Sequence, residues 1–365
     1  MPYNGQGRLP GVLMSMPDLR AVMFVCLLAS SAEAAGQALL FDENAVLDVR
    51  IEAPIGVLMD VRPDEAYLKG TFAFTDSNAQ EHTVSLKLRT RGNYRRDKSH
   101  CDFAPIRLNF PRNDVYGTLL TGQDKLKLVT HCRTHEAEYQ HYLLREYLAY
   151  RLFAALSETS YRVRLLRITY VDTQDVSELT RYGFVIEDDK SVRKRNGLKK
   201  DKSRQVGHDD HDARRQNLDH VYQYMIGNTE YSLSAQEPGK NCCQNMDLLS
   251  ATKQPPFIAL PFDFDFSGLV DAPYAEPNPR YPIKTVSTRF YKGLCKNNAL
   301  LPETLDIFQS RRKDLLAVID EIAGLDEDTA RAMQSARNYI ETFYKVIDDP
   351  DGVQEQLAGR CAEPS

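Results

Sequence analysis

Two aspartates, Asp263 and Asp265, alternate with three phenylalanines directly after a predicted strand at residues 257–261. On an extended backbone alternate side chains share one face, so both carboxylates are expected on the same side. Carboxylates this close repel each other unless a proton or a cation lies between them. A hard divalent cation such as Mg²⁺ binds oxygen ligands of this kind. The pattern predicts a metal site; the alternative is a strand with one solvent face and one core face.

A polar loop containing Asn228, Glu230 and Asn245 precedes this strand in the sequence. Kinase-type phosphoryl transfer uses a carboxylate to orient the acceptor hydroxyl, then an amide ligand for metal, then a metal-binding aspartate. The order along this chain is the same. We therefore predict Glu230 and Asn228 as catalytic residues and Asn245 as a metal ligand. An ordinary polar surface loop is the alternative.

Basic residues earlier in the chain could contact the phosphates of a nucleotide. Lys125 and Lys127 share one face of a predicted strand, and Glu146 on the following predicted helix could pair with Lys127, as in kinases. Arg91 is one of four arginines around Gly92, a pattern that suits bidentate contacts with phosphate. The alternatives are surface side chains and a basic hairpin tip.

The elements that must position these residues change in type along the chain. Half-buried strands are predicted where apolar and polar residues alternate, at residues 46–51, 83–89, 106–110, 161–171 and 182–186. Helices are predicted where apolar residues recur at helical spacing, at residues 136–156, 218–226, 305–325 and 328–347. The highly charged stretch that begins at Glu187 is interpreted as a solvated, mobile loop.

The N-terminal residues indicate export. Arg20 precedes an apolar run at residues 21–29, and Ala32-Glu33-Ala34 resembles a signal-peptide cleavage site. The run is shorter than the roughly 20 residues that span a bilayer, so no membrane span is expected after cleavage. Met14 and Met16 are alternative start positions, and a buried N-terminal helix is the alternative to a signal peptide.

Cysteine and charge content agree with an exported protein. Six of the seven cysteines follow the predicted signal peptide; many pairings are open, and Cys101–Cys132 is the best single prediction, because each flanks a strand-like segment of the same region. A zinc site is less consistent with their spacing. The net charge of −5 gives no general attraction to nucleic acid, so none is predicted as a partner.

Taken together, the segments between residues 86 and 270 resemble the CotH-like (spore coat protein H-like) family of atypical protein kinases. The matching segments are Arg91-Gly92-Asn93, Leu144-Arg145-Glu146, Phe184-Val185-Ile186-Glu187, Gly227-Asn228-Thr229-Glu230 and Pro261-Phe262-Asp263-Phe264-Asp265. By this resemblance Asp263 is the principal metal ligand with Asp265 beside it, and Glu187 lies near the nucleotide.

The resemblance implies an α+β, two-lobed protein-kinase-like fold. Its expected parts are a signal peptide (1–35), a β-rich N-terminal lobe (36–130), a helix and strands that complete it (131–186), a charged mobile loop (187–217) and a C-terminal lobe (218–365). The implied function is a periplasmic or secreted phosphotransferase. It would use ATP or another nucleotide with Mg²⁺ or Mn²⁺ and act on a protein or peptide acceptor in the cell envelope.

Two departures from the family pattern keep another function open. Glu230 stands where the family usually has Asp, and Gln244 stands where a His often precedes the Asn; a glycine-rich phosphate loop is also absent from the sequence. These changes favour a catalytically silent binding or envelope-assembly module as the alternative. A hydrolase of the haloacid-dehalogenase type would also use an Asp-x-Asp pair, but in that family the pair follows the first strand.

Overall fold

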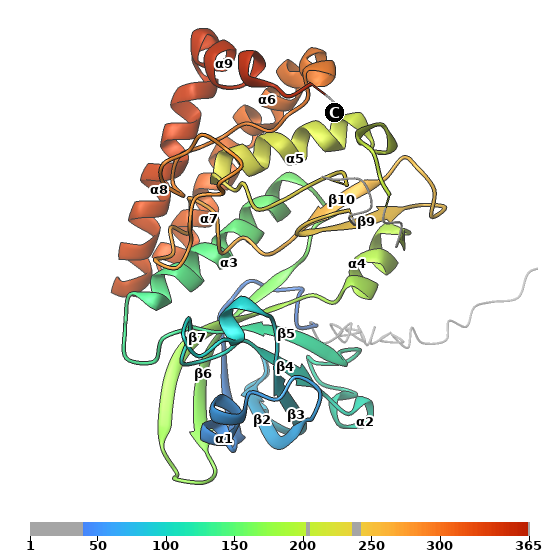
Figure 1. Ribbon diagram of the computed structural model, residues 1–365. Helices are drawn as coiled ribbons and strands as arrows, with labels where there is room; N and C mark the ends of the chain where they lie inside the picture. The colour runs from blue at the N-terminus through green and yellow to red at the C-terminus, as the bar shows by residue number, and fades with distance from the viewer. Residues whose placement is uncertain (1–38, 202–204, 236–241, 364–365) are drawn as a thin grey trace, which may run out of the picture. The chain divides into compact units, whose positions relative to one another are not determined.

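The computed structural model describes residues 39–201, 205–235 and 242–363. Its first part is a β-barrel (Figure 1). Around the barrel the strands follow in the order β1 (Leu47–Ala53), β2 (Leu68–Thr75), β3 (Glu81–Thr90), β4 (Ile106–Asn109), β5 (Lys125–Val129), β7 (Glu178–Ile186) and β6 (Val163–Asp172). In β3, Val84, Leu86 and Leu88 are buried and the residues between them are exposed, so alternate side chains fill the barrel.

The barrel is closed by β1, which pairs with two neighbours. Ile51 lies opposite Phe72 of β2 in an antiparallel register and opposite Tyr170 of β6 in a parallel register. The predicted two-lobed, protein-kinase-like fold is therefore wrong, because that fold has a β-sheet lobe rather than a closed mixed barrel followed by a helical region. Alternation predicts strands one at a time and does not show which strands will pair.

Most of the individual strand predictions are confirmed. The strands predicted at residues 46–51, 83–89, 106–110, 161–171 and 182–186 correspond to β1, β3, β4, β6 and β7. No strand is predicted for the residues of β2, which contains Gly70. This glycine reads as a turn residue, but in β2 it allows close approach, because a Cβ there would lie 2.4 Å from the backbone oxygen of Glu52 on β1.

The C-terminal part is mainly helical. Helix α3 (Tyr139–Leu156) precedes β6 in the chain but packs with this part. The other principal helices are α5 (Ala213–Ile226), α6 (Leu301–Ser310), α7 (Arg312–Ala323), α8 (Glu327–Ile347) and α9 (Pro350–Gln356). The shorter helices are α1 (Ile55–Val61), α2 (Arg112–Val115), η1 (Tyr94–Arg96), η2 (His208–Asp210), η3 (Cys295–Leu300) and η4 (Ala358–Arg360). The helix predicted at residues 305–325 is divided at Arg311, which joins α6 to α7.

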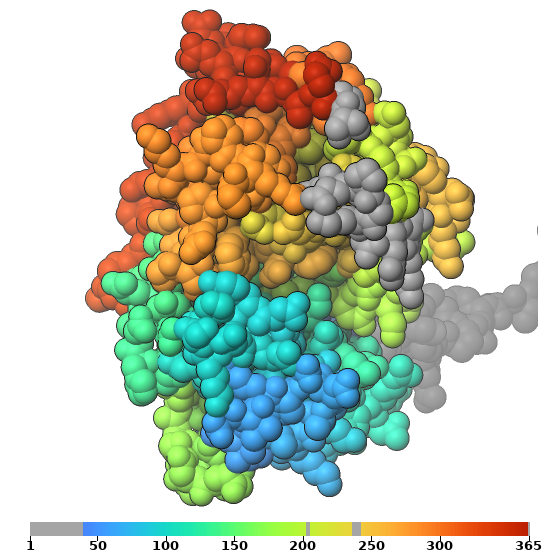
Figure 2. All heavy atoms as spheres, viewed as in Figure 1, coloured from blue at the N-terminus to red at the C-terminus, as the bar shows by residue number. Residues whose placement is uncertain are grey.

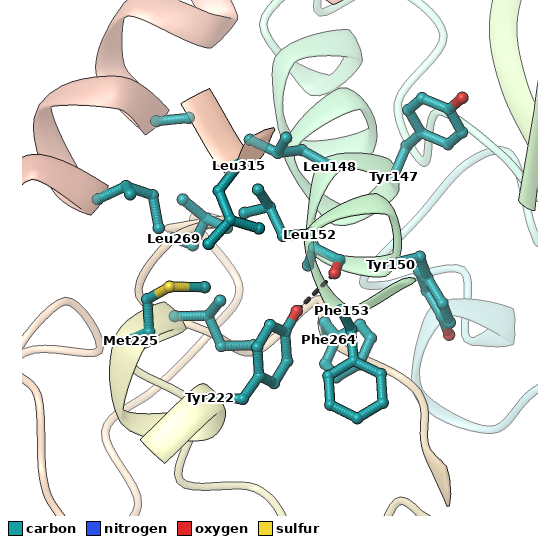
Figure 3. Packing of buried hydrophobic residues seen from close by; sticks show 14 of the residues in the cluster. Tyr147, Leu148, Tyr150, Leu152, Phe153, Tyr222, Met225, Phe264, Leu269 and Leu315 are labelled. Carbon is teal, nitrogen blue, oxygen red and sulfur yellow. Dashed lines mark hydrogen bonds between the residues drawn. The ribbon is translucent and has the colours of Figure 1, made fainter. Parts of the chain in front are cut away.

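Helix α3 is the centre of the largest core (Figure 3). Leu148 and Leu152 of α3 pack with Met225 of α5 and Leu315 of α7. The hydroxyl of Tyr222 on α5 donates a hydrogen bond of 2.5 Å to the backbone oxygen of Ala149. This packing fixes the rotation of α3, and with it the face that carries Glu146 and Tyr150.

The charged stretch after β7 is more ordered than predicted. A loop at residues 187–217 was expected, yet α4 (Asp189–Asn196) forms there, so the prediction is wrong for that segment. The Asp188 carboxylate accepts from the backbone N–H of Lys190, Val192 is buried, and Gly197 ends the helix with a φ of 65°. A small antiparallel sheet follows, in the order β10 (Ile258–Pro261), β9 (Met246–Ser250) and β8 (Lys199–Lys200).

Three disulfides join the six cysteines of the described residues. Cys101 pairs with Cys132, as predicted, and the other pairs are Cys242–Cys243 and Cys295–Cys361. The Cys101–Cys132 bond connects the segment after η1 to the segment after β5. It therefore stabilises the side of the barrel that carries Arg91 and Arg95.

Replacing both Cys101 and Cys132 by alanine is expected to lower the free energy of unfolding by about 3 kcal/mol, because cross-linked positions restrict the unfolded chain. The sequence separation of this pair is 31, against 66 for Cys295–Cys361, so the second pair should stabilise slightly more. Urea-induced unfolding of the oxidised parent and of the two double alanine variants, one for each disulfide, measures both losses of unfolding free energy. Equal stability of the double variant and the parent would contradict the expectation.

Among the residues that the structure describes, no helix is both long and apolar enough to cross a bilayer. The predicted signal peptide at residues 1–35 lies outside the described residues.

Candidate functional site

A cavity of about 310 Å³ lies between the barrel and the helical part; we call it the Asp263 cavity. It brings together seven predicted site residues: Arg91, Lys127, Glu146, Glu230, Asn245, Asp263 and Asp265. They come from the turn after β3, from β5, from α3 and from the segments around β9 and β10. Figure 2 shows part of the boundary on one face, where cyan atoms of the barrel adjoin orange atoms of the C-terminal part.

The cation that pairs with Glu146 is Arg95, and the predicted Lys127–Glu146 pair is not formed. Arg95 Nη1 lies 3.1 Å from Glu146 Oε2, and its other terminal nitrogen donates to the backbone oxygen of Thr130. Both side chains are nearly buried, with 11% and 3% of their surface exposed. Burial raises the pKa of Glu146, and nearby Asp265 adds to that effect while Arg95 opposes it.

Asp265 belongs to the same buried cluster. Its Oδ2 lies 4.0 Å from Arg95 Nη1 and accepts a hydrogen bond of 3.3 Å from the hydroxyl of Tyr274. Burial raises the pKa of Asp265, and the charge of Asp263 raises it further. In this arrangement Asp265 is engaged by protein groups, which fits an anchoring role better than direct metal binding.

Asp263 is placed differently from the sequence prediction. The strand ends at Pro261, and Asp263 has a left-handed φ of 65°, so the two aspartates do not lie on one extended face. Its backbone N–H donates 2.8 Å to the hydroxyl of Tyr150. The Asp263 side chain is exposed, and within the described residues its carboxylate has no hydrogen-bond or ion-pair partner. A non-glycine residue in this conformation is uncommon and often marks a functional position.

Glu230 is held at the rim of the Asp263 cavity by side-chain amides. Its carboxylate accepts 2.6 Å from Gln244 Nε2 and 3.3 Å from Asn278 Nδ2. Asn245 Nδ2 donates 2.8 Å to the backbone oxygen of Glu230, and Asn245 has a left-handed φ of 52°. The Asn245 side-chain oxygen is thus left for another partner.

Asn228 lies behind this loop rather than in the cavity. It is buried, its Nδ2 donates 2.9 Å to Gln223 Oε1, and its Oδ1 accepts 2.9 Å from the backbone N–H of Glu230. Gly227 ends α5 with a φ of 65°, and a Cβ there would collide with the Tyr339 hydroxyl. The predicted catalytic Asn228 therefore positions Glu230.

Arg91 and Lys127 are the uncompensated cations of the Asp263 cavity. Within the part of the chain that is described, neither has an ion pair, although Asp263 attracts both. Lys127 Nζ lies 5.1 Å from the ring centre of Phe262. Burial lowers the pKa of Lys127 to about 8, and the neighbouring charge of Arg91 contributes. Two desolvated cations without counter-ions form a site for an anion.

The remaining predicted residues, Lys125 and Glu187, line an adjoining polar cavity of about 300 Å³, the Glu187 cavity. Lys127 and Ile186 line both cavities. The Glu187 carboxylate accepts 3.1 Å from the backbone N–H of Arg162 and forms an ion pair of 3.0 Å with Arg195. Glu187 thus fixes the segment after β7.

Four contributors to the site were not predicted: Arg95, Tyr150, Tyr274 and Asn278. Tyr150 could have been found, because it follows Glu146 by one helical turn and so shares its face of α3. Arg95 belongs to the arginine-rich segment that the sequence analysis noted. Tyr274 and Asn278 lie in a segment without regular structure and carry no sequence signal.

The residues of the Asp263 cavity that could hold a metal ion are Asp263 and Asn245. The described residues hold no group of three or more His, Cys, Asp and Glu placed to bind a metal. Within the described ranges, however, the side-chain oxygens of Asp263 and Asn245 have no protein partner, and both residues line the Asp263 cavity together with Arg91 and Lys127. Mg²⁺ is commonly held by one or two carboxylates together with water and substrate phosphates.

The chain was compared with models of known protein families and with curated proteins, and neither comparison found a match.

Proposed function

We propose that this chain is an exported phosphotransferase of the CotH-like type that uses ATP and a divalent cation and acts on protein hydroxyls in the cell envelope. The observation that carries the proposal is the Asp263 cavity itself. It places the free Asp263 carboxylate with the uncompensated cations Arg91 and Lys127, and it carries Glu230 at its rim. Phosphoryl transfer depends mainly on positioning and on charge neutralisation, and these groups supply both.

Asp263 and Asn245 would hold the divalent cation, which would neutralise charge on the phosphates when bound. Arg91 and Lys127 would bind phosphate oxygens, since guanidinium and ammonium groups form charge-assisted hydrogen bonds with them. The Arg95–Glu146 pair would keep α3 and the turn after β3 in register, so that Arg91 stays in the cavity. The base and ribose would extend into the Glu187 cavity, because Lys127 and Ile186 belong to both.

Glu230 would receive the proton of the acceptor hydroxyl. The hydroxyl oxygen attacks the γ-phosphorus, the bond from that phosphorus to the bridging oxygen breaks, and ADP leaves. Gln244 and Asn278 each donate to a different carboxylate oxygen of Glu230, and each oxygen keeps a further lone pair that can accept a proton. The two amides therefore orient Glu230 without preventing it from accepting a proton.

Calorimetry with ATP tests the proposal. We expect binding that requires Mg²⁺ or Mn²⁺, and we expect Asp263→Ala to weaken it at least tenfold (about 1.4 kcal/mol). Asp306→Ala, which removes an exposed carboxylate on α6, is the matched control and should bind like the parent. Absence of ATP binding in a folded, oxidised sample would overturn the proposal.

The affinity for ATP is expected to fall as the pH rises from about 7 to about 9. Phosphate contacts favour the charged ammonium of Lys127, whose pKa of about 8 places its deprotonation in this range. Lys127→Arg keeps its charge throughout and should show no such fall. Repeating the calorimetry at several pH values measures the effect; the same pH profile in both proteins would assign the titration to another group.

A catalytically silent binding or envelope-assembly module is the second candidate. The observation that favours it is the double amide contact to Glu230, which holds a side chain longer than the family's aspartate in one place. Such a module would bind ATP without converting it to ADP. Measuring ADP release beside binding separates the two functions.

A further inference from the structure

A third cavity, of about 480 Å³, is lined in part by the residues that directly follow Glu230 in the chain. We call it the Lys292 cavity. Its walls are largely aromatic, from Tyr231, Tyr281, Phe290 and Tyr291. The rings of Tyr281 and Phe290 stack with their centres 4.7 Å apart. The chain around Cys361, tied to Cys295 by a disulfide, forms a further wall. Neither the phosphotransferase proposal nor the sequence motifs use this cavity.

The polar centre of the cavity is the ammonium group of Lys292. It donates 3.2 Å to the backbone oxygen of Thr229 and 2.5 Å to that of Tyr231, and it lies 4.0 Å from the ring centre of Tyr231. An ammonium has three N–H donors, so one remains unused. No acidic side chain of the described residues forms an ion pair with it. Burial lowers the pKa of Lys292 to about 7, and the charge of nearby Glu230 offsets this only in part.

A second unsatisfied group lies on the same wall. His220 is 3% exposed; its Nδ1 is 2.7 Å from the Tyr231 hydroxyl, and its Nε2 has no hydrogen-bond partner among the described residues. Buried polar atoms are almost always paired, so such an orphan points to a missing ligand. Burial lowers the pKa of His220, which keeps the ring neutral. When Tyr231 donates to Nδ1, the proton on Nε2 is a free donor.

Further charged side chains line the cavity. Arg280 and Arg360 line it, and Glu363 is the single acidic residue among its described lining residues. The cavity therefore combines an ammonium with a spare donor, a histidine nitrogen without a partner among the described residues, and stacked aromatic walls. Its volume lies in the range of small-molecule sites.

We infer that the Lys292 cavity binds a small aromatic anion. Its ring would pack against Tyr281 and Tyr231, and its carboxylate or phosphate would accept from Lys292 and His220. Aromatic walls favour a planar ring, and a desolvated cation favours an acidic group over a neutral one. The two backbone oxygens that Lys292 contacts flank Glu230, so an occupant would also brace the loop that holds this residue.

Calorimetry with phenyl phosphate and with benzoate tests this inference on the oxidised full chain. We expect saturable binding with a dissociation constant of about 0.1–1 mM, typical for ligands of this size. Benzyl alcohol, which has the ring without the charge, should bind at least about tenfold more weakly. Lys292→Met should weaken phenyl phosphate binding at least about tenfold, and Lys296→Met, on a neighbouring exposed lysine, should leave it unchanged.

Two further variants locate the binding site. Tyr281→Leu leaves the Lys292 contacts to the loop in place and should still weaken binding several-fold, which guards against misfolding of the Lys292 variant. Lys127→Met removes a cation of the Asp263 cavity, so phenyl phosphate bound there should be lost, while the binding that depends on Lys292 should persist. Absence of saturable binding, equal binding of benzyl alcohol, or loss in Lys127→Met with retention in Lys292→Met would each overturn the inference. Benzoate carries no phosphate, so its dependence on Lys292 is measured separately from the binding of ATP to the Asp263 cavity.

Discussion

Arg95→Met is expected to lower the free energy of unfolding by about 3–5 kcal/mol at about pH 8, where the buried carboxyl groups beside Arg95 must give up their protons or remain charged without a partner. Arg95 is the cation between Glu146 and Asp265, and both carboxyl groups are buried. Its loss would also leave the backbone oxygen of Thr130 without the hydrogen bond that Arg95 donates. Urea-induced unfolding at about pH 8 measures the change.

The loss should grow with pH. Burial raises the pKa of Glu146 and of Asp265 in the folded protein, so near neutrality the folded state binds protons that the unfolded state releases. Stability from such groups is complete below their unfolded pKa and falls as the pH rises through the folded pKa. Without Arg95 the pKa values of both carboxyl groups rise further. We therefore expect the variant to lose more unfolding free energy, relative to the parent, at about pH 8 than at about pH 5.

Arg96→Met is the matched control. Arg96 is the next residue in the chain and pairs with Asp64, whose side chain is 59% exposed, so the change should stay within about 1 kcal/mol. Combining Arg95→Met with Glu146→Leu removes both charges and should recover part of the loss. If Arg95→Met lost no more unfolding free energy than Arg96→Met, the contacts of Arg95 with Glu146 and Asp265 would not stabilise the fold.

Glu230→Gln is expected to slow phosphoryl transfer by about 10²–10⁴-fold while leaving the affinity for ATP unchanged, because only the carboxylate can take the proton. Glutamine has nearly the same shape, and its side-chain oxygen can still accept from Gln244 or Asn278. The measurement compares the conversion of ATP to ADP, with Mn²⁺ and a hydroxyl-rich peptide mixture, with calorimetric binding of ATP.

Glu230→Asp supplies the control for position. It keeps the carboxylate and moves it by about one methylene, so we expect partial activity with unchanged binding. An unchanged rate in Glu230→Gln would exclude Glu230 as the proton acceptor. A parent protein that binds ATP without releasing ADP would favour the silent module.

Strands and helices were predictable where the pattern is local. Val84, Leu86 and Leu88 alternate with exposed residues, and this period alone identifies β3. The closure of the barrel was not predictable in this way, because the parallel pairing of β1 with β6 joins segments far apart in the chain. The short α4 was missed because its stability comes from two end caps and the burial of Val192, not from a long apolar stripe.

The site shows a similar division. The order of the polar segments along the chain was enough to select residues that line the Asp263 cavity together. This prediction requires only that the segments lie close to one another in the fold. Which side chains pair within the cavity depends on backbone and side-chain dihedral angles, and the sequence pattern does not specify these angles. Arg95 rather than Lys127 reaches Glu146, and the left-handed turn at Asp263 separates two aspartates that a straight strand would align.

Closure of the barrel has a consequence for contacts between molecules. An open sheet ends in a row of unpaired N–H and C=O groups that can pair with a strand of another chain. Here β1 covers the rows that β2 and β6 would otherwise present. This one strand, at the start of the described chain, therefore protects the barrel against edge-to-edge aggregation, and any shortened form of the protein must retain residues 47–53 to remain monodisperse.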